Sequence, residues 1–295
     1  MHVVKIDISL KEKLKSYLEE QNFEFSFPPY TFFQAKKKGI SCILYLSGKL
    51  VISGKSSSDF IEFFLEPTIL KSFSYNYPDI KKNLEIRMGI DESGKGDFFG
   101  PLCISGVSAT SQKDLEFLYS LNLKDSKLMR DSQIKIIAKE IQKIPHYTIV
   151  FFPEKYNELY DKFQNLNSLL AWSHATVIEN LSLKTPLVHL AISDQFAKKE
   201  VLEEALKRKH LNICLSQKYK AESDVVVAAA SILARNSFIM GISKLESAYN
   251  VKLPKGAGIL TKKAGLSIYK NYGIRVLEKL SKKHFKTFKE ITENK

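Results

Sequence analysis

The chain has 295 residues, of which 44% are hydrophobic and 26% charged, so it can bury a substantial core and falls outside the intrinsically disordered class. Its 45 Lys and Arg residues outnumber its 32 Asp and Glu residues, and the net charge of +13 favours a polyanionic partner, either nucleic acid or an anionic membrane. Three widely spaced cysteines argue against a disulfide framework and against a Cys-x-x-Cys zinc site.

Two patterns that would place the chain at a membrane are missing. The first residues, Met1 to Lys5, lack the pattern of a secretory signal peptide. No uninterrupted apolar run approaches the roughly 20 residues that span a bilayer. We therefore expect a monomer in the reducing cytoplasm, with no membrane partner.

Residues 1–75 are predicted to form a small α+β domain. Ser9 and Glu12 fit a capping box, with Ser at the N-cap and Glu at N3, and the helix that follows is expected to run to about Gln21. Three strand-like runs separated by Gly-containing turns predict an antiparallel meander, and a short amphipathic helix completes the domain. The expected strands are 30–35, 41–46 and 49–53, and the last helix is 59–65.

Residues 76–84 are polar, have no regular hydrophobic period, and are interpreted as a linker. From residue 85 to residue 295, apolar strand-like runs alternate with long helical stretches, which predicts an α/β domain with some parallel strand pairing. The expected strands are 85–90, 102–107, 147–152 and 187–192, and the expected helices are 133–143, 166–181, 199–209 and 224–240.

Two consecutive acids, Asp91 and Glu92, close the first strand of this domain, and a turn with Gly94 and Gly96 follows. Consecutive residues of a regular strand point to opposite faces, so we expect the strand to twist or bend if both carboxylates are to approach one metal centre. The two glycines permit a tight turn and a close approach of backbone N–H groups to a ligand. The simpler interpretation is an acid pair beside a solvent-exposed hairpin turn.

The same stretch contains a misleading match. Residues 89–95 fit Gly-x-x-x-x-Gly-Lys, the first part of a phosphate-binding loop. The next position of that motif is Ser or Thr, which helps to hold magnesium, and here it is Gly96. Asp91 and Glu92 would also lie within the loop and repel the phosphate. These features argue against a nucleoside triphosphatase.

Four segments resemble, in order, the motifs of type 2 ribonucleases H. Residues 91–97, Asp-Glu-Ser-Gly-Lys-Gly-Asp, resemble the opening motif of that family, and residues 124–127 resemble its Asp-Ser-Lys segment. Ser193 and Asp194, at the end of an expected strand, are similar in position to its third acid, and residues 228–235 resemble its Ala-Ala-Ser-Ile helix. The resemblance covers the chain from about residue 84 to the C-terminus.

Further segments are similar to the ribonuclease HIII branch of this family, namely 98–101, 165–174, 253–258 and 283–286. That branch also carries an N-terminal domain that resembles half of a TATA-box-binding protein, and residues 1–75 match it in layout. The resemblance implies a ribonuclease H-like catalytic domain at residues 85–295, with a central mixed sheet flanked by helices.

The resemblance also implies that Asp91, Glu92, Asp194 and Glu222 are the catalytic residues and hold two Mg²⁺ or Mn²⁺ ions. Carboxylates are suitable ligands for such hard cations, and two ions about 3.5–4 Å apart can activate water and neutralise the leaving oxygen. The wider family has Asp where this chain has Glu222, whereas the ribonuclease HIII branch is similar in having Glu. Asp224 remains the alternative fourth acid, or else it stabilises a helix N-terminus.

Residues near the acids are expected to contact the substrate. In the family that the chain resembles, the loop at Gly94, Lys95 and Gly96 contacts ribose hydroxyls, and the 2′-hydroxyl is what distinguishes RNA from DNA. Ser126 and Lys127 are candidates for hydroxyl and phosphate contacts. The simpler interpretations are a helix N-cap for Ser126 and a solvated surface group for each lysine.

The first domain offers a second candidate substrate surface. Tyr30, Phe32 and Gln34 are expected on one face of a strand, with Lys36 beside them. Aromatic and basic side chains on a sheet can lie along a nucleic acid. The simpler interpretation is an exposed, lysine-rich loop.

The resemblance and the residues together predict an endonuclease that hydrolyses the RNA strand of RNA–DNA hybrids and leaves 5′-phosphomonoesters. One alternative is the type 2 activity that incises at single ribonucleotides in duplex DNA. The other is a non-catalytic nucleic-acid-binding protein, against which the full set of acids argues. A metal-dependent cleavage assay on a long hybrid distinguishes an enzyme from a binding protein.

Overall fold

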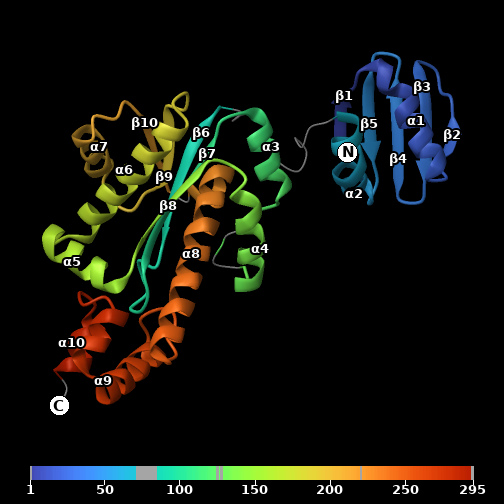
Figure 1. Cartoon of the computed structure of the whole chain (residues 1–295). Helices are drawn as coiled ribbons and strands as arrows, with labels where there is room; N and C mark the ends of the chain where they lie inside the picture. The colour runs from blue at the N-terminus through green and yellow to red at the C-terminus, as the bar shows by residue number, and fades with distance from the viewer. Residues whose placement is uncertain (1, 71–84, 124–125, 127–128, 220, 294–295) are drawn as a thin grey trace. The chain divides into compact units, whose positions relative to one another are not determined.

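The computed structural model describes most of the chain: residues 2–70, 85–123, 126, 129–219 and 221–293. The chain divides into two compact units, Met1–Leu84 and Glu85–Lys295 (Figure 1). The second unit starts at the residue predicted for the second domain. The predicted linker, residues 76–84, lies outside the described residues.

The first unit is a five-stranded antiparallel sheet, in the order β1-β5-β4-β3-β2, with helices packed on one face. Its strands are β1 (His2–Lys5), β2 (Glu24–Ser26), β3 (Thr31–Lys37), β4 (Ile40–Tyr45) and β5 (Lys49–Ser53). Its helices are α1 (Lys11–Glu20) and α2 (Ser57–Phe60), which continues as a π-helix over Ile61–Leu70. The predicted meander is confirmed by β3, β4 and β5. The outer strands β1 and β2 have only four and three residues, too few to give a clear alternating pattern.

The start of α1 differs from the prediction. The side chain of Asp7, and not that of Ser9, makes the capping bond, and it accepts from the backbone N–H of Ser9 at 2.9 Å. This bond caps a 3-10 turn over Ile8–Leu10, and α1 begins after the turn at Lys11. An aspartate in an extended conformation two residues earlier therefore takes the capping role that we predicted for Ser9.

Alternation along the strands gives the first sheet a covered face and an open face. The buried side chains of the covered face are Phe33, Ala35, Cys42, Leu44, Leu50 and Ile52. Gln34 and Lys36 alternate with them along β3 and therefore lie on the open face. The prediction that this strand starts at Tyr30 was wrong. β3 begins at Thr31, and Tyr30 lies before it with a φ of 65°, outside the extended conformation of a strand.

The second unit is built on a five-stranded mixed sheet, in the order β10-β9-β6-β7-β8. Its strands are β6 (Arg87–Ser93), β7 (Leu102–Ala109), β8 (His146–Phe151), β9 (Leu190–Asp194) and β10 (Cys214–Lys218). β7 runs antiparallel to β6 and β8, whereas β9 runs parallel to β6 and β10. This arrangement confirms the predicted α/β class with some parallel pairing.

Helices cover both faces of the mixed sheet. One face packs against α6 (Leu166–Lys184) through side chains that include Met88 and Ile90 of β6. The other face packs against α8 (Val225–Tyr249), the long helix in Figure 1 that continues from the sheet towards α9. Gly89 of β6 makes the second contact possible, because a Cβ atom there would lie 2.3 Å from the backbone of α8.

By length and composition alone, α8 is apolar enough to cross a membrane. In this fold, 78% of its apolar window is buried inside the unit. It contacts β6 and β7 on the sheet side and α4 (Asp131–Ile141) beside it. Its apolar character is therefore that of a central core helix.

The remaining helices are α3 (Gln112–Ser120), α5 (Pro153–Phe163), α7 (Lys199–Arg208), α9 (Ile259–Leu280) and α10 (Lys286–Thr292). We had not predicted α3, α5, α9 or α10 from the sequence. The two C-terminal helices, α9 and α10, form an apolar cluster with Phe98 and Phe99, which follow β6. This cluster supports the turn that comes directly after the tandem acids.

Candidate active site

The four predicted acids lie together at one end of the mixed sheet. Asp91 and Glu92 in β6, Asp194 at the end of β9 and Glu222 in the turn before α8 line one cavity of about 390 Å³. The other lining residues are Ser93, Gly94, Lys95, Gly96, Asp97, Ser126, Ser231 and Arg235. Carboxylates from three separate parts of the sequence therefore share one wall.

Strands β6 and β9 bring Asp91 and Asp194 close together. The parallel pairing of these strands ends with Ile90 opposite Ser193, and the two aspartates are the next residues along each strand. β6 itself stays in regular register with β7 up to Ser93. This pairing shows no β-bulge at the acids, and the cavity forms where the pairing with β9 ends.

Asp91 and Glu92 point to opposite faces, as the geometry of a strand requires. Asp91 lies on the side of α8, where its carboxylate accepts a hydrogen bond from Ser231. Glu92 lies on the side of α6, where it contacts His174. Both line the cavity because it opens at the end of the sheet and not on one of its faces.

The turn after β6 needs glycine at one position and leaves another open. Gly94 has a φ of 90°, and a Cβ atom there would lie 2.2 Å from the carbonyl oxygen of Pro101. Gly96 is exposed, and nothing lies within 4 Å of the position where its Cβ atom would be. A ligand can therefore approach the backbone of Gly96 closely, next to the acids.

A buried lysine supports this turn from behind. Lys282 is fully buried, and its Nζ donates to the carbonyl oxygens of Asp97 at 2.8 Å and Gly100 at 2.7 Å. Burial lowers the pKa of Lys282 to about 7. The neutral amine has two N–H groups, which matches the two carbonyl acceptors. Asp97 also accepts a hydrogen bond from the backbone N–H of Gly256 at 2.6 Å.

Asp91 carries the clearest electrostatic signature of the cavity. Burial and the neighbouring charge of Glu92 raise the pKa of Asp91 to about 7, and the charge of Asp194 adds to this effect. Hydrogen bonds from Ser231 and from the backbone N–H of Glu92, at 2.8 Å, act in the opposite direction. Burial is thus the largest cause of the raised pKa of Asp91, and the neighbouring carboxylates add to it.

Glu92 is held by two side chains. Burial alone would raise the pKa of Glu92, but the hydrogen bond and charge of His174 and the charge of Lys95 bring it below its ordinary value. Nε2 of His174 lies 3.1 Å from Oε2 of Glu92, and Nζ of Lys95 lies 3.5 Å from Oε1. Glu92 is therefore stabilised as a carboxylate.

Asp194 and Glu222 are linked through the backbone. Oδ1 of Asp194 accepts a hydrogen bond from the N–H of Ala221 at 3.1 Å. Ala221 begins the 3-10 turn Ala221–Ser223, in which Glu222 is the next residue. Asp194 therefore anchors the turn that brings Glu222 to the cavity.

Asp224, the alternative fourth acid, is engaged elsewhere. Its Oδ2 lies 2.9 Å from Nε of Arg87, and the side chains are only 7% and 1% exposed. Its Oδ1 accepts from the backbone N–H of Val226 at 2.9 Å and so caps α8. This position matches our second interpretation of Asp224, a residue that stabilises a helix N-terminus.

The predicted substrate contacts are only partly found at the cavity. Gly94, Lys95 and Gly96 line it. Ser126 lines it as well, but only 6% of this residue is exposed and its hydroxyl is hydrogen-bonded to Ser231 at 2.9 Å. Lys127 lies outside the described residues. The remaining candidates, Tyr30, Gln34 and Lys36, belong to the first unit.

Two cavity residues were not predicted as site residues. Ser231 and Arg235 both lie on α8 and both line the cavity. They are four residues apart, a spacing that places two side chains on one face of a helix. The signal was present in the motif at residues 228–235, where the only two polar side chains are these two.

The cavity contains the residue types that Mg²⁺ or Mn²⁺ takes as ligands. Among the described residues, no group of three or more His, Cys, Asp or Glu side chains is arranged closely enough to hold a metal ion as it stands. Asp91, Glu92 and Asp194 instead accept hydrogen bonds from the protein. Burial and the charges of Glu92 and Asp194 raise the pKa of Asp91, and a divalent cation would favour its ionised form. The donor set therefore fits such a cation once the side chains turn towards it.

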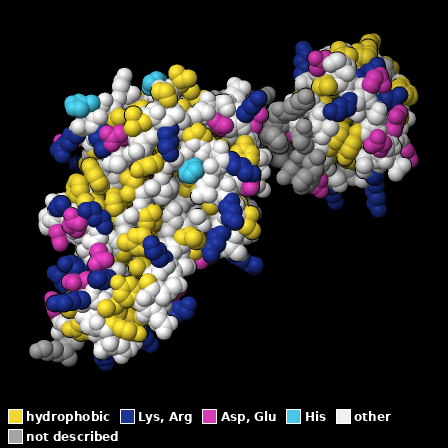
Figure 2. Space-filling view, in the orientation of Figure 1, with side chains coloured by type: hydrophobic (Ala, Val, Ile, Leu, Met, Phe, Trp, Pro, Cys, Tyr) yellow, Lys and Arg dark blue, Asp and Glu magenta, His cyan; other side chains and the backbone are white. Residues whose placement is uncertain are grey.

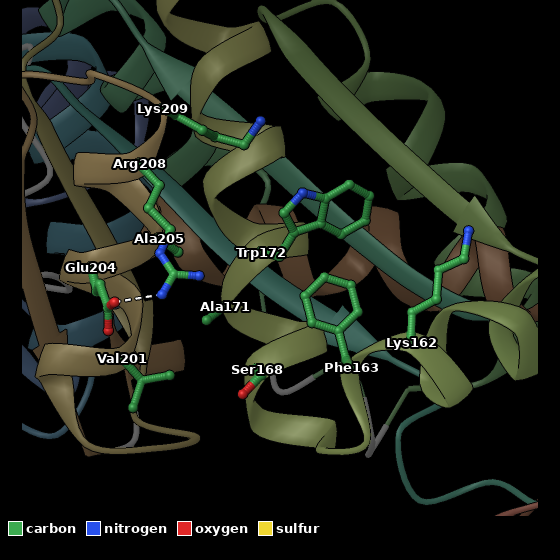
Figure 3. A pocket seen from close by; sticks show the side chains of 10 residues that line it. All are labelled: Lys162, Phe163, Ser168, Ala171, Trp172, Val201, Glu204, Ala205, Arg208 and Lys209. Atoms are coloured by element: carbon green, nitrogen blue, oxygen red, sulfur yellow. Dashed lines mark hydrogen bonds and ion pairs between the residues drawn. The ribbon is translucent and has the colours of Figure 1, made fainter.

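A second cavity, of about 430 Å³, lies between α5, α6 and α7 (Figure 3). Its charged rim is already paired within the protein. Lys162 contacts Glu158 at 3.0 Å, Arg208 contacts Glu204 at 2.5 Å, and Lys209 contacts a further glutamate at 2.5 Å. None of the four candidate acids lines this cavity. The carboxylate cavity is therefore the candidate active site.

Comparison with known families and proteins agrees with this geometry. Residues 88–288 match the family described as Ribonuclease HII, and residues 1–76 match one described as Domain of unknown function (DUF3378). Ribonuclease HIII of Chlamydia pneumoniae is 52% identical over 295 residues, which cover 99% of this chain and 98% of that protein. Ribonuclease HIII of Chlamydia muridarum (strain MoPn / Nigg) is 49% identical over 291 residues, or 98% of this chain and 96% of that protein.

Two solved structures are similar over nearly the whole chain. Bst-RNase HIII in complex with Mn²⁺ is 26% identical with a TM-score of 0.67, and the match covers 98% of this chain and 97% of that one. Aquifex aeolicus RNase H3 is 26% identical with a TM-score of 0.57, over 95% and 98% of the two chains. The family match spans most of the second unit, and the relatives match from end to end. The chain therefore belongs to the ribonuclease HII family, and within it to the ribonuclease HIII branch.

Proposed function

We propose that this protein hydrolyses the RNA strand of RNA–DNA hybrids endonucleolytically and leaves 5′-phosphomonoesters. The observation that carries the proposal is the convergence of Asp91, Glu92, Asp194 and Glu222 on one cavity. Relatives that are about half identical over the full chain are named Ribonuclease HIII, and a structural neighbour is a complex with Mn²⁺.

The four acids would hold two divalent cations, Mg²⁺ or Mn²⁺. When bound, these ions supply a hydroxide nucleophile near neutral pH and neutralise the charge that develops on the leaving 3′-oxygen. A bound cation would favour the ionised form of Asp91, whose pKa is raised to about 7 by burial and by the charge of Glu92. Asp194 at the end of β9 and Glu222 in the turn Ala221–Ser223 would complete the ligand set, and the hydrogen bond from the N–H of Ala221 to Asp194 links them.

The turn after β6 would select RNA. A protein distinguishes RNA from DNA by contacting the 2′-hydroxyl. Gly96 presents exposed backbone beside the acids, and the glycine-only geometry of Gly94 sets the direction of this backbone. Lys95 and Arg235 line the same cavity and would contact phosphate oxygens.

The open face of the first sheet would bind the hybrid and contribute affinity. Along this face, Gln34 is paired with Ile43, and Lys36 with Ser41. Lys5 is paired with Lys49 at the β1–β5 end of the sheet. Basic side chains are distributed over the visible face of both units, where they are interspersed with acidic ones (Figure 2). Phosphate contacts can therefore come from both units.

We further propose that one chain is sufficient and that it acts in the cytoplasm. All four candidate acids come from a single chain. The three cysteines, Cys42, Cys103 and Cys214, are free thiols, which suits a reducing compartment.

The test is cleavage of a 5′-labelled RNA strand in a long hybrid, with Mg²⁺ or Mn²⁺. We expect several internal products with parent protein and none with Asp91→Asn. No metal-dependent cleavage of the hybrid would refute the proposal. Efficient cutting of duplex DNA with one ribonucleotide, together with poor cutting of the hybrid, would assign the other type 2 activity instead.

A further inference from the structure

His174 connects the two strands that carry the candidate metal ligands. It lies on α6, is fully buried, and contacts one residue of β6 and one of β9. Its Nε2 is 3.1 Å from Oε2 of Glu92, and its Nδ1 is 3.3 Å from the hydroxyl oxygen of Ser193. The ring of Phe196 packs against it, with 4.7 Å between ring centroids. One imidazole therefore contacts the acid of β6 and the residue before the acid of β9.

The direction of one of these hydrogen bonds follows from counting protons. The carboxylate of Glu92 can only accept, so Nε2 of His174 donates to it. Nδ1 of the same ring is hydrogen-bonded to the hydroxyl of Ser193, which also lies 3.0 Å from the carbonyl oxygen of Asp194. The two ring nitrogens therefore make one bond towards each strand.

This arrangement leaves one oxygen of Glu92 available. Oε2 is fixed by the buried ring, whereas Oε1 contacts the partly exposed Lys95, which also lines the cavity, at 3.5 Å. The contact between Lys95 and Glu92 is long and partly solvated, so it contributes little. A cation can replace Lys95 at Oε1 without disturbing the bond to His174.

We propose that His174 is a positioning residue for the metal ligands: it fixes Glu92 on β6 and, through Ser193, the end of β9 that carries Asp194. This inference rests on the proposed function, because it assigns the carboxylates to cations. Residues that orient metal ligands through hydrogen bonds commonly change metal affinity or activity by about 10–100-fold when they are removed.

Variants of His174 separate the two bonds. The side-chain amide of a glutamine can take the place of Nε2 and that of an asparagine the place of Nδ1, whereas alanine removes both hydrogen-bonding atoms. We therefore expect His174→Gln to keep the bond to Glu92, and His174→Asn to keep only the bond to Ser193. Ser173→Ala is the matched control, because Ser173 is the buried neighbour on α6 whose hydroxyl bonds only within its own helix, to the carbonyl of Leu169 at 2.7 Å.

The experiment measures Mn²⁺ binding to the full chain by calorimetry without substrate, and then kcat and KM on a hybrid. We expect His174→Ala to weaken Mn²⁺ binding and lower kcat by about 10–100-fold, with KM for the hybrid within about twofold. His174→Gln should recover to within about threefold of the parent, His174→Asn should not, and Ser173→Ala should match the parent.

Two results would overturn the positioning role. One is parental Mn²⁺ affinity and kcat in His174→Ala. The other is equal loss in the alanine and glutamine variants, together with a lower thermal midpoint, since this pattern belongs to a packing residue. Asp91→Asn distinguishes this failure from failure of the proposed function. Should Asp91→Asn bind Mn²⁺ as the parent does, the metal site itself is wrongly assigned.

Discussion

Replacing each of two neighbouring acids by its amide should separate a catalytic carboxylate from a structural one. Glu222 lines the cavity, whereas Asp224 pairs with Arg87 and caps α8. We expect Glu222→Gln to remove most of the activity and to leave the free energy of unfolding nearly unchanged. We expect Asp224→Asn to lower the free energy of unfolding and to leave kcat of the folded enzyme within about twofold of the parent.

The structure gives the size of the effect at Asp224. Its carboxylate lies 2.9 Å from Arg87, and the two side chains are 7% and 1% exposed. Removing one partner of such a buried pair costs about 3–5 kcal/mol, because the other charge stays buried. Asparagine is as good an N-cap as aspartate, so Asp224→Asn reports on the ion pair alone. Asp224→Ala also removes the cap and should cost about 1 kcal/mol more.

Urea unfolding followed by the fluorescence of Trp172 is the appropriate assay, since this single tryptophan lies on α6 in the second unit. Removing both charges in Arg87→Met/Asp224→Asn should restore most of the lost stability, because no unpaired charge then remains buried. If Asp224→Asn unfolds as the parent does but has lost turnover, while Glu222→Gln cleaves normally, the fourth acid has been assigned to the wrong residue.

Asp91→Asn and Asp194→Asn should each lower kcat by a factor on the order of 10³ or more, with hybrid affinity largely kept; normal single-turnover rates in saturating Mg²⁺ would contradict this. Lys36→Ala should make the plot of the logarithm of the binding constant against the logarithm of the salt concentration less steep, by a slope of about one unit. Lys37→Ala is its control, since that Nζ is held by a backbone carbonyl at 2.8 Å. The free energy of unfolding of the parent, measured relative to that of Lys282→Met, should rise by about 1 kcal/mol per pH unit between pH 7 and 9. The reason is that the pKa of Lys282 is about 7 in the folded protein and 10.5 ordinarily, so the unfolded chain binds more protons over this range. A pH-independent difference would argue against a buried neutral amine.

The composition of the candidate site could be predicted because its acids are signalled locally. Asp91 and Glu92 follow an apolar run, Asp194 ends another, and Glu222 precedes a long apolar helix. Each position is the end of a strand or the start of a helix, and parallel strands bring such ends to one edge of a sheet. Local patterns do not show which distant segments meet at the site. That information came from the order of the motifs along the chain, which resembles that of type 2 ribonucleases H.

Other parts of the site depend on contacts that no local pattern encodes. Lys282 is surrounded by charged residues in the sequence, a pattern typical of an exposed side chain. In the structure it is fully buried, and its Nζ donates to the carbonyl oxygens of Asp97 and Gly100. β10 has only five residues, and of these Leu215 is part of the core, so it gives little periodic signal. The role of His174 depends on its partners, which lie 82 and 19 residues away along the chain.

We predicted a twist or bend of β6 on the assumption that two adjacent acids must reach the site from one face of the sheet. The site instead lies at the end of the sheet, so Asp91 and Glu92 keep their opposite directions and each depends on a different helix. α8 supplies Ser231 to Asp91, and α6 supplies His174 to Glu92. A tandem acid pair near a strand end can therefore line one cavity from both faces of a sheet whose strand pairing stays regular, because a helix on each face contacts one of the two carboxylates.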